Sequence, residues 1–150
     1  MVVSPDVGST ARARNFSMKL GCNMAIVDKR RERANQSEVM NIIGNVEGKT
    51  CILLDDMVDT AGSLVGAAKA IVEIGGAKEV YACASHGVLS GPAIERIDGS
   101  AIKELLLLDT IPYPENAEKC EKIKYMSVAP VFAEAIQRVY EEISISNLFE

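Results

Sequence analysis

Short apolar runs alternate with segments of helical period along most of the chain. Apolar runs bounded by turn residues predict buried strands at residues 2–3, 24–27, 39–44, 50–54, 80–84, 105–108 and 123–126. Apolar residues at helical spacing predict helices at residues 11–20, 64–72, 92–97 and 128–139. Continuously apolar strands separated by helices are typical of parallel sheets that are buried on both faces. The sequence therefore predicts an α/β fold of three layers, in which helices flank a mostly parallel central sheet.

The polar segment 29–38 interrupts this pattern and predicts an exposed loop. It follows a predicted strand and begins with Lys29-Arg30-Arg31, so its cations could reach an anion bound at the same edge of the sheet. Most charge runs of this kind are simply solvated surface, and that interpretation remains open for this segment.

Composition sets further limits. The 150 residues suit a single domain, 1–150, of ordinary globular composition, with 48% hydrophobic and 25% charged residues. The net charge of −5 argues against a surface dedicated to nucleic acid. No apolar stretch is long enough to predict a membrane span, and the four dispersed cysteines suggest neither a zinc site nor a disulfide framework, so we expect a cytoplasmic protein. A strand that begins at the first residues suggests a domain of a longer chain.

One segment, residues 51–64, carries most of the predicted chemistry. The strand leads into Asp55 and Asp56, and the small-residue loop 59–63 then enters a helix. Backbone N–H groups at such a helix entrance can hold a phosphate, whereas paired carboxylates suit sugar hydroxyls or magnesium. Both features together predict a site for a pentose phosphate. The simpler interpretation is a capped helix with Asp59 or Thr60 at the N-cap.

Here the residues resemble a known family. The segment from Asp55 to Ser63 resembles the phosphoribosyl pyrophosphate motif of type I phosphoribosyltransferases and of ribose-phosphate pyrophosphokinases. Other segments resemble the pyrophosphokinases alone, and specifically their C-terminal half. These segments are Val3-Ser4-Pro5-Asp6-Val7-Gly8, Asp28-Lys29-Arg30-Arg31, Ser85-His86-Gly87, Ser90-Gly91-Pro92-Ala93, Asp109-Thr110-Ile111-Pro112 and Ser146-Asn147-Leu148-Phe149.

The resemblance implies a type I phosphoribosyltransferase-like fold and an activity. A ribose-phosphate diphosphokinase transfers the diphosphate of ATP to the 1-hydroxyl of ribose 5-phosphate, giving phosphoribosyl pyrophosphate and AMP. Asp59, Thr60, Ala61, Gly62 and Ser63 would then bind the 5-phosphate, while Asp55 and Asp56 would bind the ribose hydroxyls. Asp6 would bind Mg²⁺, and Lys29 and Arg31 would be the catalytic cations on a loop that closes.

The resemblance also implies partners. The family's N-terminal half, which carries adenine-binding segments and a metal-binding histidine, has no counterpart in this sequence, and the single histidine, His86, suits a structural role at a strand end. We therefore expect a missing N-terminal domain, a homo-oligomer, and a chain that binds ribose 5-phosphate but turns over poorly by itself. The chemistry predicts neither nucleic-acid nor membrane partners.

Two alternatives remain. Gly44-Asn45-Val46-Glu47-Gly48-Lys49-Thr50 resembles a P-loop, which would indicate a nucleotidase, but its spacing is one residue short and a predicted strand follows where the motif requires a helix. A hairpin turn is the simpler interpretation of that segment. The other alternative is a non-catalytic regulatory module that retains only the sugar-phosphate pocket.

Overall fold

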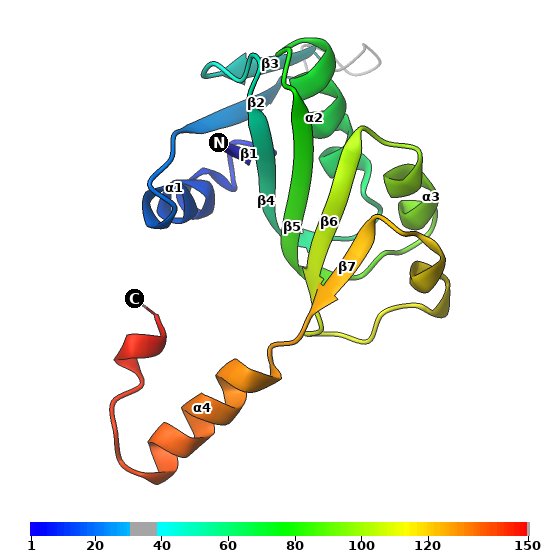
Figure 1. The fold of residues 1–150 in the computed structure, drawn as a ribbon. Helices are drawn as coiled ribbons and strands as arrows, with labels where there is room; N and C mark the ends of the chain where they lie inside the picture. Colours follow the sequence, from blue (N-terminus) through cyan, green and yellow to red (C-terminus); the bar gives the residue numbers. More distant parts are fainter. Residues whose placement is uncertain (31–38, 150) are drawn as a thin grey trace.

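The computed structural model describes residues 1–30 and 39–149, and within them a seven-stranded sheet forms the centre of the fold (Figure 1). The strand order is β3-β2-β1-β4-β5-β6-β7. All neighbouring strands are parallel except β2 and β3, which are antiparallel. The strands are β1 (Val2–Ser4), β2 (Met24–Arg30), β3 (Val39–Ile43), β4 (Thr50–Val58), β5 (Glu79–Gly87), β6 (Ile102–Leu108) and β7 (Ile123–Met126).

Helices cover both faces of this sheet, which confirms the predicted three-layer α/β fold. Helix α1 packs on one face through Ala13 and Phe16, whereas α2 and α3 pack on the other. The described helices are α1 (Thr10–Lys19), α2 (Gly62–Glu73), α3 (Ala93–Asp98) and α4 (Ala129–Tyr140), with short 3-10 turns η1 (Glu115–Lys119) and η2 (Ser146–Leu148). None of the described helices is both long and apolar enough to cross a membrane.

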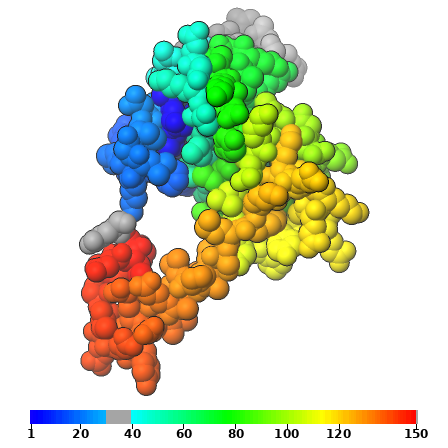
Figure 2. All heavy atoms as spheres, in the orientation of Figure 1, coloured from blue at the N-terminus to red at the C-terminus, as the bar shows by residue number. Residues whose placement is uncertain are grey.

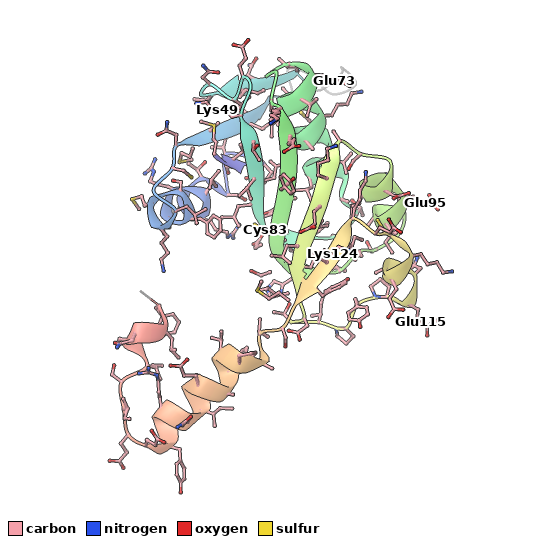
Figure 3. The ribbon with its side chains drawn as sticks, viewed as in Figure 1. Lys49, Glu73, Cys83, Glu95, Glu115 and Lys124 are labelled. Carbon is pink, nitrogen blue, oxygen red and sulfur yellow. The ribbon has the colours of Figure 1, made fainter. Side chains whose placement is uncertain are left out.

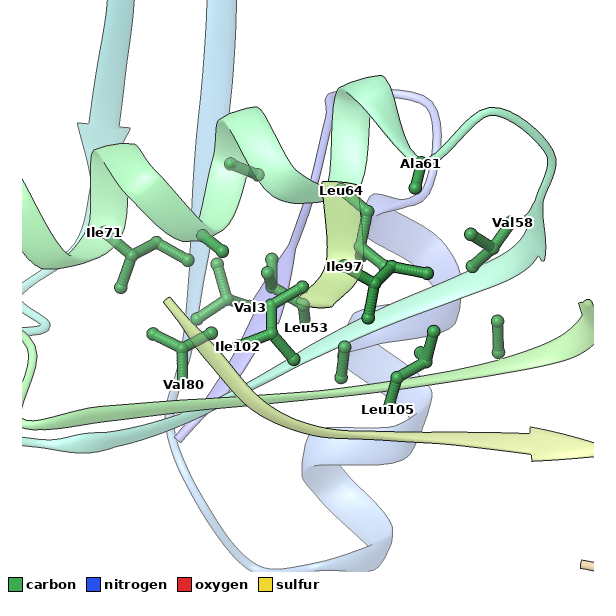
Figure 4. Packing of buried hydrophobic residues seen from close by; sticks show 14 of the residues in the cluster. Val3, Leu53, Val58, Ala61, Leu64, Ile71, Val80, Ile97, Ile102 and Leu105 are labelled. Carbon is green, nitrogen blue, oxygen red and sulfur yellow. The ribbon is translucent and has the colours of Figure 1, made fainter. Parts of the chain in front are cut away.

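The main core lies between the sheet and helix α2 (Figure 4). Leu64 and Ile71 lie on the buried face of α2, and both belong to the core cluster that includes Leu53 of β4. Small residues at Ala67 and Ala68 let the helix lie close to the strands. Burial of this apolar surface is the main force that fixes the start of α2, and with it the loop before the helix.

Several strands extend beyond their predicted ends, and in β2 and β4 the extension includes candidate site residues. Strand β2 continues to Arg30 because its residues pair with β3, with Lys29 opposite Met40. The prediction that Lys29 belongs to a loop is therefore wrong, while Arg31 lies outside the described residues. Strand β4 likewise continues through both acids to Val58, which pairs with Gly87. In each case the ladder to a neighbouring strand overrides the polar character of the segment.

Helix α4 forms at the predicted position but lies apart from the sheet (Figures 1 and 2). Its apolar residues share one face, as predicted, yet none of its residues is buried. Phe132 is 61% exposed and Ile136 is 68% exposed. Within the described residues, the end of this segment contacts the main body through a hydrogen bond of 3.0 Å from Lys19 Nζ to the Phe149 carbonyl oxygen. The apolar stripe of α4 thus adds nothing to the core of this chain.

The contrast between α2 and α4 yields a matched prediction. Ile71→Ala should lower the free energy of unfolding by about 2–5 kcal/mol, because it removes fully buried methyl groups. Ile136→Ala should change it by less than about 0.5 kcal/mol, because the same groups are exposed. Urea unfolding of the two variants measures the difference. Equal losses would mean that α4 packs against the body in solution.

Candidate functional site

Asp6 and the predicted site residues of segment 55–63 meet where the order of the strands in the sheet reverses, whereas Lys29 does not line the cleft that they form and Arg31 lies outside the described residues. From β1 the chain proceeds outward to β2 and β3, then returns to β4 and proceeds outward on the other side. Ligands of open α/β sheets bind at such a switch point, beyond the carboxyl ends of the strands. Asp6 follows β1, and residues 55–64 form the end of β4 and the entrance of α2. Together they line a cleft of about 270 Å³.

The loop between β4 and α2 presents unpaired backbone groups. Asp59, Thr60, Gly62 and Ser63 are exposed, whereas the Ala61 side chain is buried. Ala61 adopts a left-handed conformation with φ of 60°, which is uncommon for a residue with a Cβ atom. Within the described residues, no turn or loop hydrogen bond uses the N–H groups of residues 59–63. These N–H groups therefore remain available to a ligand.

The carbonyl groups of the same loop are all engaged elsewhere. Four successive carbonyl oxygens, those of residues 58–61, accept hydrogen bonds of 2.9–3.0 Å. The donors are, in order, the N–H of Leu89, the N–H of Ser90, Nη1 of Arg96 and the N–H of Val65. In a trans peptide the N–H group points opposite to the carbonyl group. The N–H groups of residues 59–62 therefore point away from the donors that bind the carbonyl oxygens of residues 58–61. The carbonyl oxygens of the loop are thus bonded within the protein, while its N–H groups, which carry the positive ends of the peptide dipoles, are left for a ligand.

The carboxylates of Asp55 and Asp56 lie beside this loop and share a cation. Arg12 Nη2 is 3.1 Å from Asp56 Oδ2, and Arg12 Nη1 is 3.7 Å from Asp55 Oδ1. The Asp55 side chain is only 15% exposed, whereas that of Asp56 is 60% exposed. Ser9 Oγ donates to Asp55 Oδ1 over 3.4 Å. Asp56 is therefore the more accessible acceptor for a ligand hydroxyl.

The pKa values of Asp55 and Asp56 are shifted in opposite directions. The pKa of Asp55 is raised from an ordinary 3.8 to about 6, chiefly by burial, and the neighbouring Asp56 carboxylate contributes to this rise. The pKa of Asp56 is lowered, chiefly because the Asp55 side chain hydrogen-bonds to it. The pair consequently takes up one proton more readily than two separate exposed acids would.

Asp6 is held by its own turn. The Ser9 N–H donates to Asp6 Oδ1 over 2.7 Å, and Ser4 Oγ donates to the Asp6 carbonyl oxygen over 2.6 Å. No group of three or more His, Cys, Asp or Glu residues in the described part of the chain is arranged to hold a metal ion. Magnesium often binds through one or two carboxylates while phosphates and water complete its shell. One fixed carboxylate fits that kind of partial site.

Asp59 and His86 form contacts that favour structural roles. Ser90 Oγ donates a hydrogen bond to Asp59 Oδ1, which ties the loop of residues 59–63, the predicted anion loop, to the β5–α3 connection. The Asp59 side chain is thus bonded to protein, and its N–H is the group that remains for a phosphate. His86 Nδ1 lies 2.7 Å from Thr110 Oγ1, whose hydroxyl donates to the Ser85 carbonyl oxygen. This arrangement agrees with a structural histidine near a strand end.

The P-loop alternative does not fit the fold. Lys49 precedes Thr50, the first residue of β4, and no helix follows them. Lys49 lies at the opposite end of β4 from the acids (Figure 3). The segment is a turn, but the prediction of a hairpin is wrong, because β3 and β4 are not neighbours in the sheet.

Sequence reasoning missed several residues of this site. Arg12, Ser9 and Arg96 all contact predicted site residues, and none of them was predicted to belong to the site. Ser90 belongs to a segment noted only for its resemblance to a family. The missed residues precede or follow the central motif by more than twenty-five residues, so no local pattern links them to it.

Comparisons with known proteins agree with this geometry. The family model described as "Phosphoribosyl synthetase-associated domain" matches residues 30–150. The chain belongs to this phosphoribosyl synthetase-associated domain family. It is 59% identical to the ribose-phosphate pyrophosphokinase of Clostridium tetani over 150 residues, which cover 100% of this chain and 46% of that relative. The chain therefore spans about half the length of the curated relatives it matches, and its resemblance to ribose-phosphate pyrophosphokinases is confirmed.

Solved structures support the fold of this phosphoribosyl synthetase-associated domain. The phosphoribosylpyrophosphate synthetase of Mycobacterium smegmatis superposes with a TM-score of 0.83 at 37% identity, over 94% of this chain and 45% of that one. An orotate phosphoribosyltransferase from Aeropyrum pernix superposes with a TM-score of 0.56 at 13% identity, over 89% of this chain and 63% of that one. The second likeness shows the fold alone, and it confirms the predicted type I phosphoribosyltransferase-like architecture.

The raised pKa of Asp55 predicts how stability depends on pH. Between pH 4 and 6 the folded chain binds more protons at Asp55 than the unfolded chain does, so this group lowers stability as the pH rises. Asp55→Asn should remove that slope and raise the free energy of unfolding at pH 7. Urea unfolding at pH 4.5 and 7 tests both statements.

Asp109 supplies a control of opposite sign. Its pKa is lowered, first by a hydrogen bond from Ser127, so its stabilising contribution is present above its ordinary pKa and is lost as the pH falls. Asp109→Asn should therefore destabilise the chain at pH 7 more than at low pH. A parent chain whose stability rises steadily from pH 4 to 6, unchanged by Asp55→Asn, would contradict the assignment for Asp55.

Proposed function

We propose that this chain is the ribose 5-phosphate-binding catalytic domain of a ribose-phosphate diphosphokinase. The observation that carries the proposal is the pairing, in one cleft, of outward N–H groups at residues 59–63 with the carboxylates of Asp55 and Asp56. A phosphate ester needs the first feature and vicinal hydroxyls need the second. The relative named above is by name a ribose-phosphate pyrophosphokinase, and the structural neighbour is by name a phosphoribosylpyrophosphate synthetase.

In this proposal the sugar binds in a single orientation. Its 5-phosphate accepts hydrogen bonds from the loop 59–63 and lies on the axis of α2, whose N-terminal dipole favours an anion. Its 2- and 3-hydroxyls donate to Asp56 and Asp55, with Asp56 the more exposed acceptor. These two anchors use the 5-phosphate and the 2- and 3-hydroxyls, and they leave the 1-hydroxyl unbound. That is the group that must react.

The reaction is a diphosphoryl transfer. The 1-hydroxyl oxygen forms a bond to the β-phosphorus of ATP, the bond from that phosphorus to the α,β-bridging oxygen breaks, AMP departs, and the hydroxyl proton is released. Such transfers depend on alignment and on neutralising the charge on phosphate oxygens. Lys29 lies near the carboxyl end of β2, which runs parallel to β1. Lys29 therefore lies toward the same end of the strands as Asp6.

Arg31, which lies outside the described residues, is the second proposed cation. When bound, Mg²⁺ would neutralise phosphate charge, and Asp6 is the residue of this chain that would hold it. Recognition of the adenine would fall to the other half of the full-length enzyme, since this chain spans 46% of its relative. A cytoplasmic homo-oligomer remains the expected assembly.

A charge test at Gly62 examines the anion loop. Gly62→Asp should weaken binding of ribose 5-phosphate by about 100-fold or more, because it places a like charge among the N–H groups. Gly62→Asn adds a side chain of the same shape without the charge, and should retain most of the affinity. Gly62 has an ordinary φ, and a Cβ atom there meets its nearest neighbour at 3.5 Å, so both variants should fold. Calorimetric titration measures the affinities, and equal losses in the two variants would contradict the proposal.

A second experiment separates an enzyme from a regulatory module. In the two-domain enzyme, Lys29→Ala should lower the rate of AMP formation by about 100-fold or more, while the affinity for ribose 5-phosphate stays within about threefold. Lys49→Ala is the matched control, because Lys49 lies at the far end of the sheet. Unchanged AMP formation in Lys29→Ala would favour a role without catalysis for this residue.

A further inference from the structure

Among the described residues, Arg96 is the one donor to the anion loop that uses a charged side chain. Its Nη1 donates to the Thr60 carbonyl oxygen over 2.9 Å, from a helix that lies 36 residues further along the chain. Among the described residues Arg96 forms no ion pair. The side chain of the preceding residue, Glu95, points away from the body of the protein (Figure 3). The charge of Arg96 is therefore directed to the loop rather than to a partner carboxylate.

The helix that carries Arg96 is firmly fixed. Ala93 and Ile97 of α3 are fully buried in the core cluster, and Ile97 lies next to Leu64 of α2 (Figure 4). The Arg96 N–H also donates to the Pro92 carbonyl oxygen over 3.0 Å. The backbone of Arg96 therefore holds a constant position relative to the entrance of α2.

The hydrogen bond from Arg96 holds a peptide in an orientation that its backbone disfavours. Ala61 has a φ of 60°, and a rotation of the Thr60–Ala61 peptide by about 180° would return it to the common region of negative φ. The same rotation would point the Thr60 carbonyl oxygen into the cleft and the Ala61 N–H out of it. A phosphate would then meet a negative dipole end in place of a donor.

We propose that Arg96 is a positioning residue for phosphate binding. It keeps the Thr60 carbonyl oxygen turned away, so that the Ala61 N–H faces the ligand, and it places a positive charge beside the loop. Its Nη1 lies 3.5 Å from the point where a Cβ atom on Gly62 would stand. This inference rests on the proposed function, because it assumes that the anion at the loop is the 5-phosphate of the sugar.

The test compares three variants of the 150-residue chain. Arg96→Ala should weaken binding of ribose 5-phosphate by about tenfold or more, because both the donor and the charge are lost. Arg96→Lys keeps a charged donor and should stay within about threefold of the parent. Arg14→Ala removes an exposed arginine of α1 that forms no ion pair with a described residue, and should bind like the parent. Should Arg96→Ala not fold, Arg96→Gln replaces it with the same expectation.

A second readout separates positioning from general stability. When inorganic phosphate is titrated, the Ala61 amide resonance should shift in the parent and in Arg14→Ala, and should shift much less in Arg96→Ala. Equal affinities and equal Ala61 shifts in Arg96→Ala and Arg14→Ala would overturn the inference, as would an Arg96→Lys variant as weak as Arg96→Ala. A parent that binds inorganic phosphate at Ala61 but not ribose 5-phosphate would refute the proposed function while leaving the role of Arg96 testable.

Discussion

The fixed orientation of four consecutive peptides, whose carbonyl oxygens belong to residues 58–61, is the constraint on which the site depends. Phosphate binding by bare backbone requires that N–H groups face the ligand and that carbonyl oxygens do not. A free loop would sample both orientations. Here each carbonyl oxygen has a donor, and three of the four donors belong to the β5–α3 segment. The loop is therefore organised before any ligand arrives, which reduces the entropy that binding must overcome.

Packing in the hydrophobic core holds the elements on either side of this loop in place. Helix α2 is held against the sheet by Leu64 and Ile71, and α3 is held by Ile97. Since both helices are anchored in one cluster, the anion loop and its donors keep their relative positions. The acids line the same cleft and belong to a strand that is paired on both edges. The carboxylates and the loop N–H groups are consequently held at a constant separation, which is what the proposed binding of a ligand of fixed length requires.

Much of the architecture could be predicted from hydrophobic periodicity alone. Every predicted strand and helix exists, because buried apolar runs and helical stripes reflect local constraints. The errors arose where a neighbouring segment decided the outcome. Lys29 belongs to a strand because β3 pairs with it, and the apolar stripe of α4 stays exposed because no element of the described chain covers it. Amphipathicity shows which face of a helix is apolar and would be stabilised by burial. It does not show whether another element covers that face.

By itself the sequence determined the order of the elements, the small-residue loop and the acids beside it, and these features led to the prediction of a sugar-phosphate site. Those features follow from residue type and short-range spacing. Only the tertiary structure decided that Arg12 pairs with both acids, that burial raises the pKa of Asp55, and that Arg96 reaches the Thr60 carbonyl oxygen. Each of these joins groups distant in sequence. Electrostatic and hydrogen-bonding effects depend on separation in space, which a linear pattern does not specify until the core has brought the segments together.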